Sequence, residues 1–475
     1  MSSAVAQAEI GLIGLGVMGS NLALNIAENG FPIAVWNRTG DKTTAFHAGA
    51  GALQKNIIPC LTEAEFVAAI RPPRPVIIMV KAGEAVDEQI AVLRKLLSKN
   101  DIIIDAGNAN FRDTVRRFGE LDGSGLTFIG MGVSGGEEGA RHGPSIMVGG
   151  TNASWKRVEK VLHAISAKYK DESCAAWLGT DGAGHFVKTI HNGIEYADME
   201  MIGEIYGILR DGLGMSASEI GAVFEKWNTG LLNSYLIEIS AAVLKAHDPK
   251  TKKAMVDMIV DRAGQKGTGK WSVIEAQMMG VPATAIEAAV AARSMSSFKD
   301  ERLAAEAAYG PLKTKFKGKA GDAFLRQLEL ALFAGKICAY AQGFAVMESA
   351  SQEFKWNLPM ATIAKIWRAG CIIRSQFLDT IASSFRKKEK PVNLLVAPSF
   401  IKSMKQAHGP LRKTVAMAAE AGIPVPALAS ALGYFDGYRQ GRGIANLIQA
   451  QRDFFGAHGF ERIDGGGAQH VLVQR

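Results

Sequence analysis

Three glycines in the spacing G-x-G-x-x-G constrain the fold of this chain most strongly. Gly14, Gly16 and Gly19 lie where a short apolar run, EIGLIG, gives way to the helical pattern VMGSNLALNIAEN. In a strand-turn-helix unit the first glycine permits the turn, the second lets the backbone approach a pyrophosphate, and the third lets helix and strand pack closely. The sequence therefore predicts a dinucleotide-binding domain whose first helix points its N-terminus at the phosphates. The predicted turn comprises Gly14, Leu15, Gly16, Val17, Met18 and Gly19.

The end of the next predicted strand, PIAVW, indicates which dinucleotide is bound. An NAD-binding chain usually carries Asp or Glu there to hold the ribose hydroxyls, whereas this chain has Asn37, Arg38 and Thr39. A guanidinium group binds a 2′-phosphate bidentately, and Asn37 and Thr39 offer further donors. The alternative is a capping turn with an incidental arginine. Because the acid is missing where a basic residue is present, we predict NADP.

Three more apolar runs read as strands that end near the same ligand. PVIIMV ends at Val80 and leads into Lys81 and Ala82, and DIIID leads into Asn108. Continuous apolar runs fit strands that are covered on both faces, and ligands lie beyond the carboxyl ends of such strands. We therefore expect these residues beside the nicotinamide or the substrate. After the run LTFIGMGV, the exposed amides and hydroxyl of a polar turn suit a carboxylate, and that turn contains Ser134, Gly135 and Gly136.

A polar face on a predicted helix marks a second candidate site. In GHFVKTIHNGIEYADM, offsets of three, four, seven and eight residues place Lys188, His191, Asn192, Glu195 and Tyr196 on one side. The usual explanation for such a stripe is the solvent side of an amphipathic helix. Here the neighbouring faces and the following turns are apolar, which favours a buried helix that lines a polar pocket. That pocket holds both a base and an acid.

The distribution of strand and helix patterns predicts two domains and a tail. Strand signals stop near residue 184, helical periodicity then continues to about residue 440, and the last stretch is polar and rich in glycine. Two helical stretches resemble each other loosely, which hints at an internal repeat. We predict an α/β Rossmann-like domain over residues 1–181, a large all-α domain over 182–440, and a C-terminal tail over 441–475.

Composition excludes several classes of function. The chain has 475 residues, of which 48% are hydrophobic and 21% charged, and no apolar run matches the length of a membrane helix. The first residues lack the features of a signal peptide, so a cytoplasmic protein is expected. The four cysteines share no CxxC spacing, so we expect neither a metal site nor disulfides. The net charge of +8 is dispersed, which favours a small anionic ligand over nucleic acid.

Further cationic residues lie in less specific patterns. In DRAGQKGTGKW, Lys266 and Thr268 alternate with glycines that give a ligand access to the backbone, although the pattern is not a P-loop and also fits a surface turn. Arg293, in AARSMSS, is a candidate from its spacing. Arg452 and His458 lie in the part of the tail that precedes its glycine-rich stretch and that we expect to be ordered.

Together these segments resemble the 6-phosphogluconate dehydrogenases. GVSGGEEGAR, KTIHNGIEY and QKGTGKW occur in that order, and the likeness, which includes QAQRDFFGAHGFER, covers essentially the whole chain. The resemblance implies oxidation of 6-phosphogluconate by NADP at C3, loss of the carboxylate as CO2 and formation of ribulose 5-phosphate, as in the pentose phosphate pathway. It implies no metal. It also implies a homodimer in which the tail of one subunit completes the active site of the other.

The resemblance also implies roles for individual residues. Lys188 matches the general base for the C3 hydroxyl, and Glu195 matches the acid that protonates C1. A second group matches residues that hold the sugar acid: Asn108, Ser134, Gly135, Gly136, His191 and Asn192. A third group matches residues around the phosphate, with Thr268 at the border of the substrate site: Tyr196, Lys266, Arg293, and Arg452 and His458 from the partner.

Three positions depart from the family pattern, and two rival functions remain. Gly16, Met131 and Val148 replace residues that are more often Ala, a smaller or polar residue, and Pro. None of them removes a catalytic group. A non-decarboxylating 3-hydroxyacid dehydrogenase would need neither Glu195 nor the cations of the tail, and a non-catalytic NADP-binding scaffold would not need the intact polar set.

Overall fold

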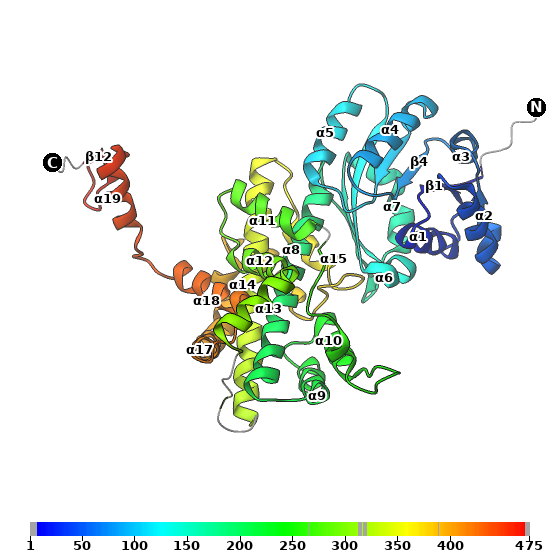
Figure 1. The fold of residues 1–475 in the computed structure, drawn as a ribbon. Helices are drawn as coiled ribbons and strands as arrows, with labels where there is room; N and C mark the ends of the chain where they lie inside the picture. Colours follow the sequence, from blue (N-terminus) through cyan, green and yellow to red (C-terminus); the bar gives the residue numbers. More distant parts are fainter. Residues whose placement is uncertain (1–6, 266, 312–315, 317–320, 388, 471–475) are drawn as a thin grey trace, which may run out of the picture.

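The computed structural model describes residues 7–265, 267–311, 316, 321–387 and 389–470. Two bodies follow one another along the chain, a sheet with helices on its faces and then a large helical body, and a thin tail leaves the helical body (Figure 1). The Rossmann-like domain and the large helical domain that the sequence predicts are both present.

The first body is built on one sheet of eight strands in the order β10-β7-β6-β5-β4-β1-β2-β3. Neighbouring strands are parallel except β6 and β7, which are antiparallel. Most of these strands are buried over their whole length, as continuous apolar runs predict. The strands are β1 (Ile10–Ile13), β2 (Ile33–Trp36), β3 (Ile57–Pro59), β4 (Pro75–Ile78), β5 (Ile102–Asp105), β6 (Thr127–Ser134), β7 (Ser145–Gly149) and β10 (Ala175–Gly179). The helices are α1 (Val17–Glu28), α2 (Gly40–Gly49), α3 (Glu63–Ala69), α4 (Glu84–Leu96), α5 (Phe111–Leu121), α6 (Gly136–His142) and α7 (Asn152–Ile165), and a small hairpin contains β8 (Lys168–Tyr169) and β9 (Glu172–Ser173).

The turn between β1 and α1 has the geometry that its glycines predict. Gly14 has φ +99°, a left-handed conformation, and a Cβ there would lie 2.5 Å from the carbonyl oxygen of Met79. A Cβ on Gly19 would lie 1.9 Å from the carbonyl oxygen of Gly14, so only glycine lets α1 pack this closely. Around Gly16 there is open space. The first and third glycines are therefore required by the protein itself, and the second leaves room for a ligand.

The second body consists of helices, and the same succession of one long and two shorter helices occurs in it twice. A long helix followed by two shorter ones is seen first in α8, α9 and α10 and again in α14, α15 and α16. The helices are α8 (Ala183–Gly207), α9 (Ala217–Asn228), α10 (Tyr235–Lys245), α11 (Thr268–Met278), α12 (Thr284–Ser297), α13 (Lys299–Tyr309), α14 (Asp322–Glu353), α15 (Met360–Ile366), α16 (Phe377–Phe385), α17 (Pro398–Glu420) and α18 (Pro426–Tyr438).

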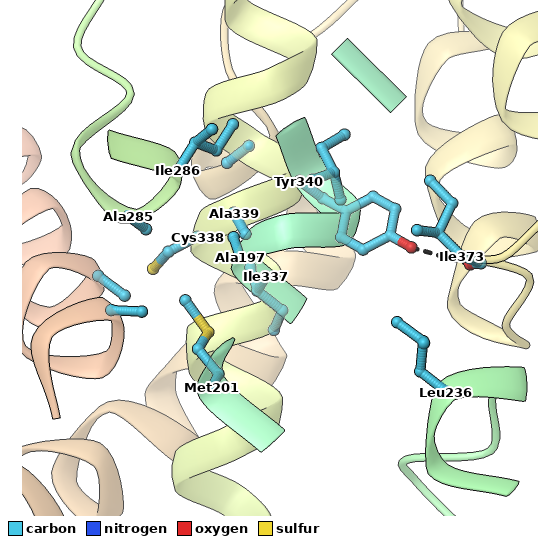
Figure 2. Packing of buried hydrophobic residues seen from close by; sticks show 14 of the residues in the cluster. Ala197, Met201, Leu236, Ala285, Ile286, Ile337, Cys338, Ala339, Tyr340 and Ile373 are labelled. Atoms are coloured by element: carbon cyan, nitrogen blue, oxygen red, sulfur yellow. Dashed lines mark hydrogen bonds between the residues drawn. The ribbon is translucent and has the colours of Figure 1, made fainter. Parts of the chain in front are cut away.

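The long helices α8 and α14 form the centre of the helical core. Ala197 and Met201 of α8 lie against Ile337 and Ala339 of α14, and the hydroxyl of Tyr340 donates a hydrogen bond to a backbone carbonyl (Figure 2). By length and composition alone α14 would suffice to span a membrane, but 83% of its most apolar stretch is buried inside the protein. The apolar run in this helix thus packs as core.

Close backbone contacts and buried carboxylates hold α8 in place. A Cβ on Gly184 would lie 2.4 to 2.5 Å from backbone atoms of β6 and β7, so the helix starts directly on the sheet. Further along, Asp198 forms an ion pair with Lys336 of α14 at 2.6 Å, and both side chains are almost fully buried. Glu204 accepts hydrogen bonds from the first amides of α18, which are those of Ala427 and Leu428. The helix that carries the polar face is therefore fixed at both ends.

Two of the departures from the family pattern are neighbours in the sheet. Met131 on β6 is the register partner of Val148 on β7, and both side chains are fully buried. Cross-strand partners of an antiparallel pair contact each other directly. The two substitutions thus share one patch of core.

The tail extends away from the helical body. It contains α19 (Ala445–Gly456) and a short hairpin of β11 (Phe460–Glu461) and β12 (Ala468–Gln469). These elements lie apart from both bodies in Figure 1. Several large apolar side chains of α19 are exposed, among them Leu447, Phe454 and Phe455. An exposed apolar surface of this kind is typical of a segment that packs against another chain.

Candidate active site

Most of the polar face of α8 is buried, and three of its side chains form a ring of hydrogen bonds with Ser134 of β6. The amine of Lys188 donates to Asn192 Oδ1 at 2.6 Å and to Ser134 Oγ at 3.3 Å. His191 lies 3.3 Å from Ser134 Oγ through Nε2 and 3.0 Å from Asn192 Oδ1 through Nδ1. The ring is satisfied when Nδ1 carries the histidine proton and Ser134 donates to Nε2. The Lys188 amine donates two hydrogen bonds in this ring, and its third position is left for a ligand.

Burial favours the neutral, proton-accepting form of the Lys188 amine. Lys188 is 7% exposed, and burial lowers its pKa from the usual value, with a smaller opposing effect from Glu195. Burial also lowers the pKa of His191 well below the usual value, and the charge of Lys188 acts in the same direction. His191 is therefore neutral and positions the other groups, while the lysine can lose its proton closer to neutral pH than a solvated lysine does.

The acid of the same helix has the opposite shift. Glu195 lies one turn beyond His191, with 3.7 Å between its Oε2 and the histidine Nδ1. Burial raises the pKa of Glu195, although the cations Lys188 and Arg293 oppose this. The opposing shifts of Lys188 and Glu195 bring a base and an acid toward the same pH range, the arrangement that proton transfer in both directions needs.

Arg293 joins the site through an aromatic ring. Its guanidinium carbon lies 4.3 Å from the centre of the Tyr196 ring, and its Nη1 donates to the carbonyl of Gly264. A Cβ on Gly269 of α11 would lie 2.7 Å from the same ring, so α11 begins against Tyr196. Thr268, the first residue of α11, is buried there. Lys266 lies outside the described residues.

The turn after β6 faces the polar side of α8. Ser134 ends the strand, and Gly135 and Gly136 both have positive φ, at +106° and +63°. A Cβ on Gly135 would lie 2.5 Å from the carbonyl oxygen of Gly370, so a distant loop packs against this turn. A Cβ on Gly132 of β6 would lie 2.5 Å from Cβ of Lys188, and the strand needs glycine there for α8 to approach.

The loop after α15 was not identified from the sequence as part of the site. The Trp367 ring meets His191 edge to face, with 5.4 Å between ring centres, and it is fully buried. Cys371 is also buried, and its pKa is raised to about 12 by burial, which makes it an inert thiol. Neither residue has a spacing or motif that relates it to α8. Only the tertiary fold brings this loop to the site.

Residues predicted to bind the cofactor line a cleft of about 680 Å³. Gly14, Arg38, Thr39, Val80 and Lys81 all border it. Lys42, in the first turn of α2, also lines this cleft, although the sequence analysis did not predict it as a cofactor-binding residue. Its position four residues after Arg38 could have indicated this role.

Asn37 has a structural role that its sequence position did not indicate. Its Oδ1 accepts a hydrogen bond from the amide of Leu15 at 3.0 Å, and its Nδ2 donates to the carbonyl of Thr39. The Oδ1 contact therefore joins the glycine turn to the end of β2, and the Nδ2 contact lies within the loop that follows β2. Arg38 is exposed beside them and points to the same cleft.

The remaining predicted residues lie at strand ends and in the tail. Lys81 follows β4 and Asn108 follows β5, and both are exposed. Arg452 contacts His458 at 3.4 Å within the tail, and both are exposed. The helix α19, which carries Arg452, lies apart from α8 of its own chain (Figure 1). Within the described ranges, His, Cys, Asp and Glu form no group of three suited to a metal ion.

Comparisons with known proteins agree over nearly the whole length. Residues 9–179 match the model of the NAD binding domain of 6-phosphogluconate dehydrogenase, and residues 184–473 match that of its C-terminal domain. Two Bacillus subtilis proteins, an NADP(+)-dependent and an NAD(+)-dependent decarboxylating 6-phosphogluconate dehydrogenase, are 47% and 45% identical; the alignments cover 98% and 97% of this chain and 98% of each relative.

A solved structure has the same fold from end to end. It is Plasmodium falciparum 6-phosphogluconate dehydrogenase, described in its apo form and in complex with NADP+ and with 6-phosphogluconate. It is 41% identical, with a TM-score of 0.94, and the match covers 98% of this chain and 99% of that one. On the two domain matches, the full-length relatives and this common fold, the chain belongs to the 6-phosphogluconate dehydrogenase family.

Proposed function

We propose that this protein oxidises 6-phosphogluconate with NADP and decarboxylates the product to ribulose 5-phosphate and CO2, as a cytoplasmic homodimer of the pentose phosphate pathway. The observation that carries the proposal is the buried contact between Lys188, Ser134 and Asn192, one turn from an acid with a raised pKa. We also propose domain limits at residues 181 and 440, which fall in the connections after β10 and α18.

The cleft beside the glycine turn fits NADP. Gly16 is the N-cap of α1 and offers no side chain to the first amides of the helix, which leaves them for a pyrophosphate. Arg38 and Lys42 are exposed cations at the far end of the same cleft, where a 2′-phosphate would lie. When bound, NADP supplies the hydride acceptor. Lys81 and Asn108, at the ends of β4 and β5, face the region where hydride transfer would occur.

Lys188 carries the first proton transfer. Its neutral amine accepts the proton of the C3 hydroxyl as the hydride leaves C3, which turns the alcohol into a ketone. The resulting ammonium, still held by Ser134 and Asn192, then polarises the ketone oxygen. The bond from C2 to the carboxylate breaks, CO2 leaves, and the electron pair moves toward the ketone, whose oxygen takes the proton of the Lys188 ammonium to give an enediol. Glu195 then donates its proton to C2, which becomes C1 of the product, and the oxygen proton returns to Lys188 as the new ketone forms.

The anionic ends of the substrate need fixed cations. The phosphate of a six-carbon acid would reach the cluster of Tyr196 and Arg293, where the guanidinium lies over the ring. The carboxylate suits the amides of Gly135 and Gly136. We propose that Arg452 and His458 of the partner subunit complete the phosphate site, because the tail that carries them leaves its own body and exposes apolar side chains.

The pH dependence of turnover tests the two proton-transfer groups. kcat should rise with pH as Lys188, whose pKa burial lowers, loses its proton, and should fall as Glu195, whose pKa burial raises, loses its own. In Glu195→Gln the alkaline fall should vanish while the acid-side rise stays, and kcat should drop roughly 10²- to 10⁴-fold. Lys188→Met is the control, with NADP binding kept and no turnover. An unchanged alkaline fall in Glu195→Gln would exclude this acid.

The choice of NADP should depend on Arg38. Removing its guanidinium takes away charge-assisted hydrogen bonds worth about 1.5 to 3 kcal/mol, so Arg38→Ala should raise the KM for NADP roughly 10- to 100-fold. The KM for NAD should stay within about twofold, because NAD has no 2′-phosphate. Arg94→Ala, on the exposed side of α4, serves as the matched control. Equal losses with both cofactors would assign Arg38 to structure and not to the phosphate.

Subunit mixing tests whether the tail acts in the partner's site. Lys188→Met and Arg452→Met chains should each form homodimers of low activity. Coexpressed, they form heterodimers in which one site combines an intact Lys188 with an intact partner tail, and about a quarter of wild-type sites should return. A chain that carries both substitutions is the control and should stay inactive. Failure of the mixed sample to gain activity would show that the tail serves its own subunit.

A further inference from the structure

One buried arginine contacts the loop after β4, which borders the cofactor cleft, and the carboxylate that ends β5. Arg117, on α5, is 1% exposed and uses four N–H bonds. Its Nε and Nη2 donate to the two oxygens of Asp87 at 2.7 and 3.0 Å. Nη2 also donates to the carbonyl of Gly83 at 2.9 Å, and Nη1 donates to Asp105 Oδ2 at 3.2 Å. A single planar group thus connects three separate segments.

Two of these contacts lie at the ends of the strands that face the cofactor. Gly83 follows Lys81 and Ala82 after β4, has φ +97°, and is the N-cap of α4. Asp105 ends β5, and its Oδ1 accepts from the amide of Gly107, the residue before Asn108. The carboxylate of Asp105 therefore bridges Arg117 and the second loop. The relative position of the two loops depends on the guanidinium between them.

The same helix also contacts the catalytic helix. Thr114 lies one turn before Arg117, and its hydroxyl is 2.7 Å from Nδ1 of His185, three residues before Lys188.

The hydrogen bond from Arg117 is the main cause that lowers the pKa of Asp87 to about 2, so Asp87 stays ionised at neutral pH. The arginine itself contacts neither the cleft nor the polar face of α8 through any of these bonds.

We propose that Arg117 is a positioning residue that holds the Lys81 to Gly83 loop and the Asp105 to Asn108 loop in register for NADP. The inference rests on the proposed function only in taking NADP as the ligand. A planar fork with fixed donors suits this task because it reaches a carbonyl and two carboxylates at once. A lysine would supply the charge but not the geometry.

The test compares two conservative variants with a neighbouring control. Arg117→Lys keeps the charge and loses the fork. Asp105→Asn is isosteric, and in either amide orientation it loses one of its two bonds, to Arg117 or to Gly107. Arg116→Lys is the control, because Arg116 also bonds Asp87, at 2.9 Å, but its side chain is 43% exposed and reaches neither loop.

NADPH binding, measured by fluorescence titration, gives a readout that does not need turnover. Arg117→Lys and Asp105→Asn should each weaken binding roughly tenfold or more, while Arg116→Lys stays within about twofold. Steady-state kinetics should show a larger change in the KM for NADP than in kcat. Amide hydrogen exchange should become faster in residues 80–84 and 105–110 of both variants and stay unchanged in the control.

The outcomes separate this inference from the proposed function. If the wild-type protein fails to bind NADPH, the proposed function fails. If the wild type binds and both variants bind equally well, Arg117 has no positioning role and only this inference is overturned. If Arg117→Lys does not fold, Asp105→Asn decides the matter, and misfolding of both variants would assign the network to folding and also overturn it.

Discussion

The active chemistry of this chain depends on the direct contact between α8 and the sheet. Gly184 lies against the backbone of β6 and β7, and Gly132 leaves space for the Lys188 side chain. This contact removes water from the amine and lowers its pKa, and it also brings Ser134 within hydrogen-bond distance. A Cβ at either glycine would move the helix away from the strand. The close approach of the two backbones thus accounts for the lowered pKa of Lys188, the residue proposed as the base.

The rest of the helical body keeps that contact in place. The buried pair of Asp198 and Lys336 joins α8 to α14, and Glu204 caps the first turn of α18. A buried charge that loses its partner is strongly destabilised. Sliding of α8 along α14 would separate the two charges, so the pair opposes that movement. Because α18 leads into the tail, the helix that carries Lys188 is also connected to the segment proposed to serve the partner subunit.

Local patterns predicted the parts of the site that are continuous in sequence. The glycine turn, the strand ends at Lys81 and Asn108, and the polar face of α8 follow from spacing and periodicity, because each lies on one element or one connection. The two domains could be predicted for the same reason. The resemblance to a family added the assignment of roles to Lys188 and Glu195, which the residue pattern alone left open.

Long-range contacts could not be predicted. Trp367 and Gly370 reach the site only because α15 folds onto the sheet, and no motif marks them. The hydrogen bond from the amide of Leu15 to Asn37, which the sequence predicts as a phosphate donor, joins the glycine turn to the end of β2 and was not predicted. The network of Arg117 joins residues from α4, β5 and α5 and is invisible as a pattern. Such contacts depend on packing between segments that are far apart in the chain.

The most direct test is to measure NADPH formation and CO2 release together, with purified protein, NADP and 6-phosphogluconate and no added metal. We expect equal amounts of both products, because the ketone formed at C3 loses the carboxylate while Lys188 and Glu195 transfer the protons. NADPH without CO2 would contradict this expectation and indicate a simple hydroxyacid dehydrogenase. Neither product, from protein that still binds NADP, would indicate a scaffold without turnover.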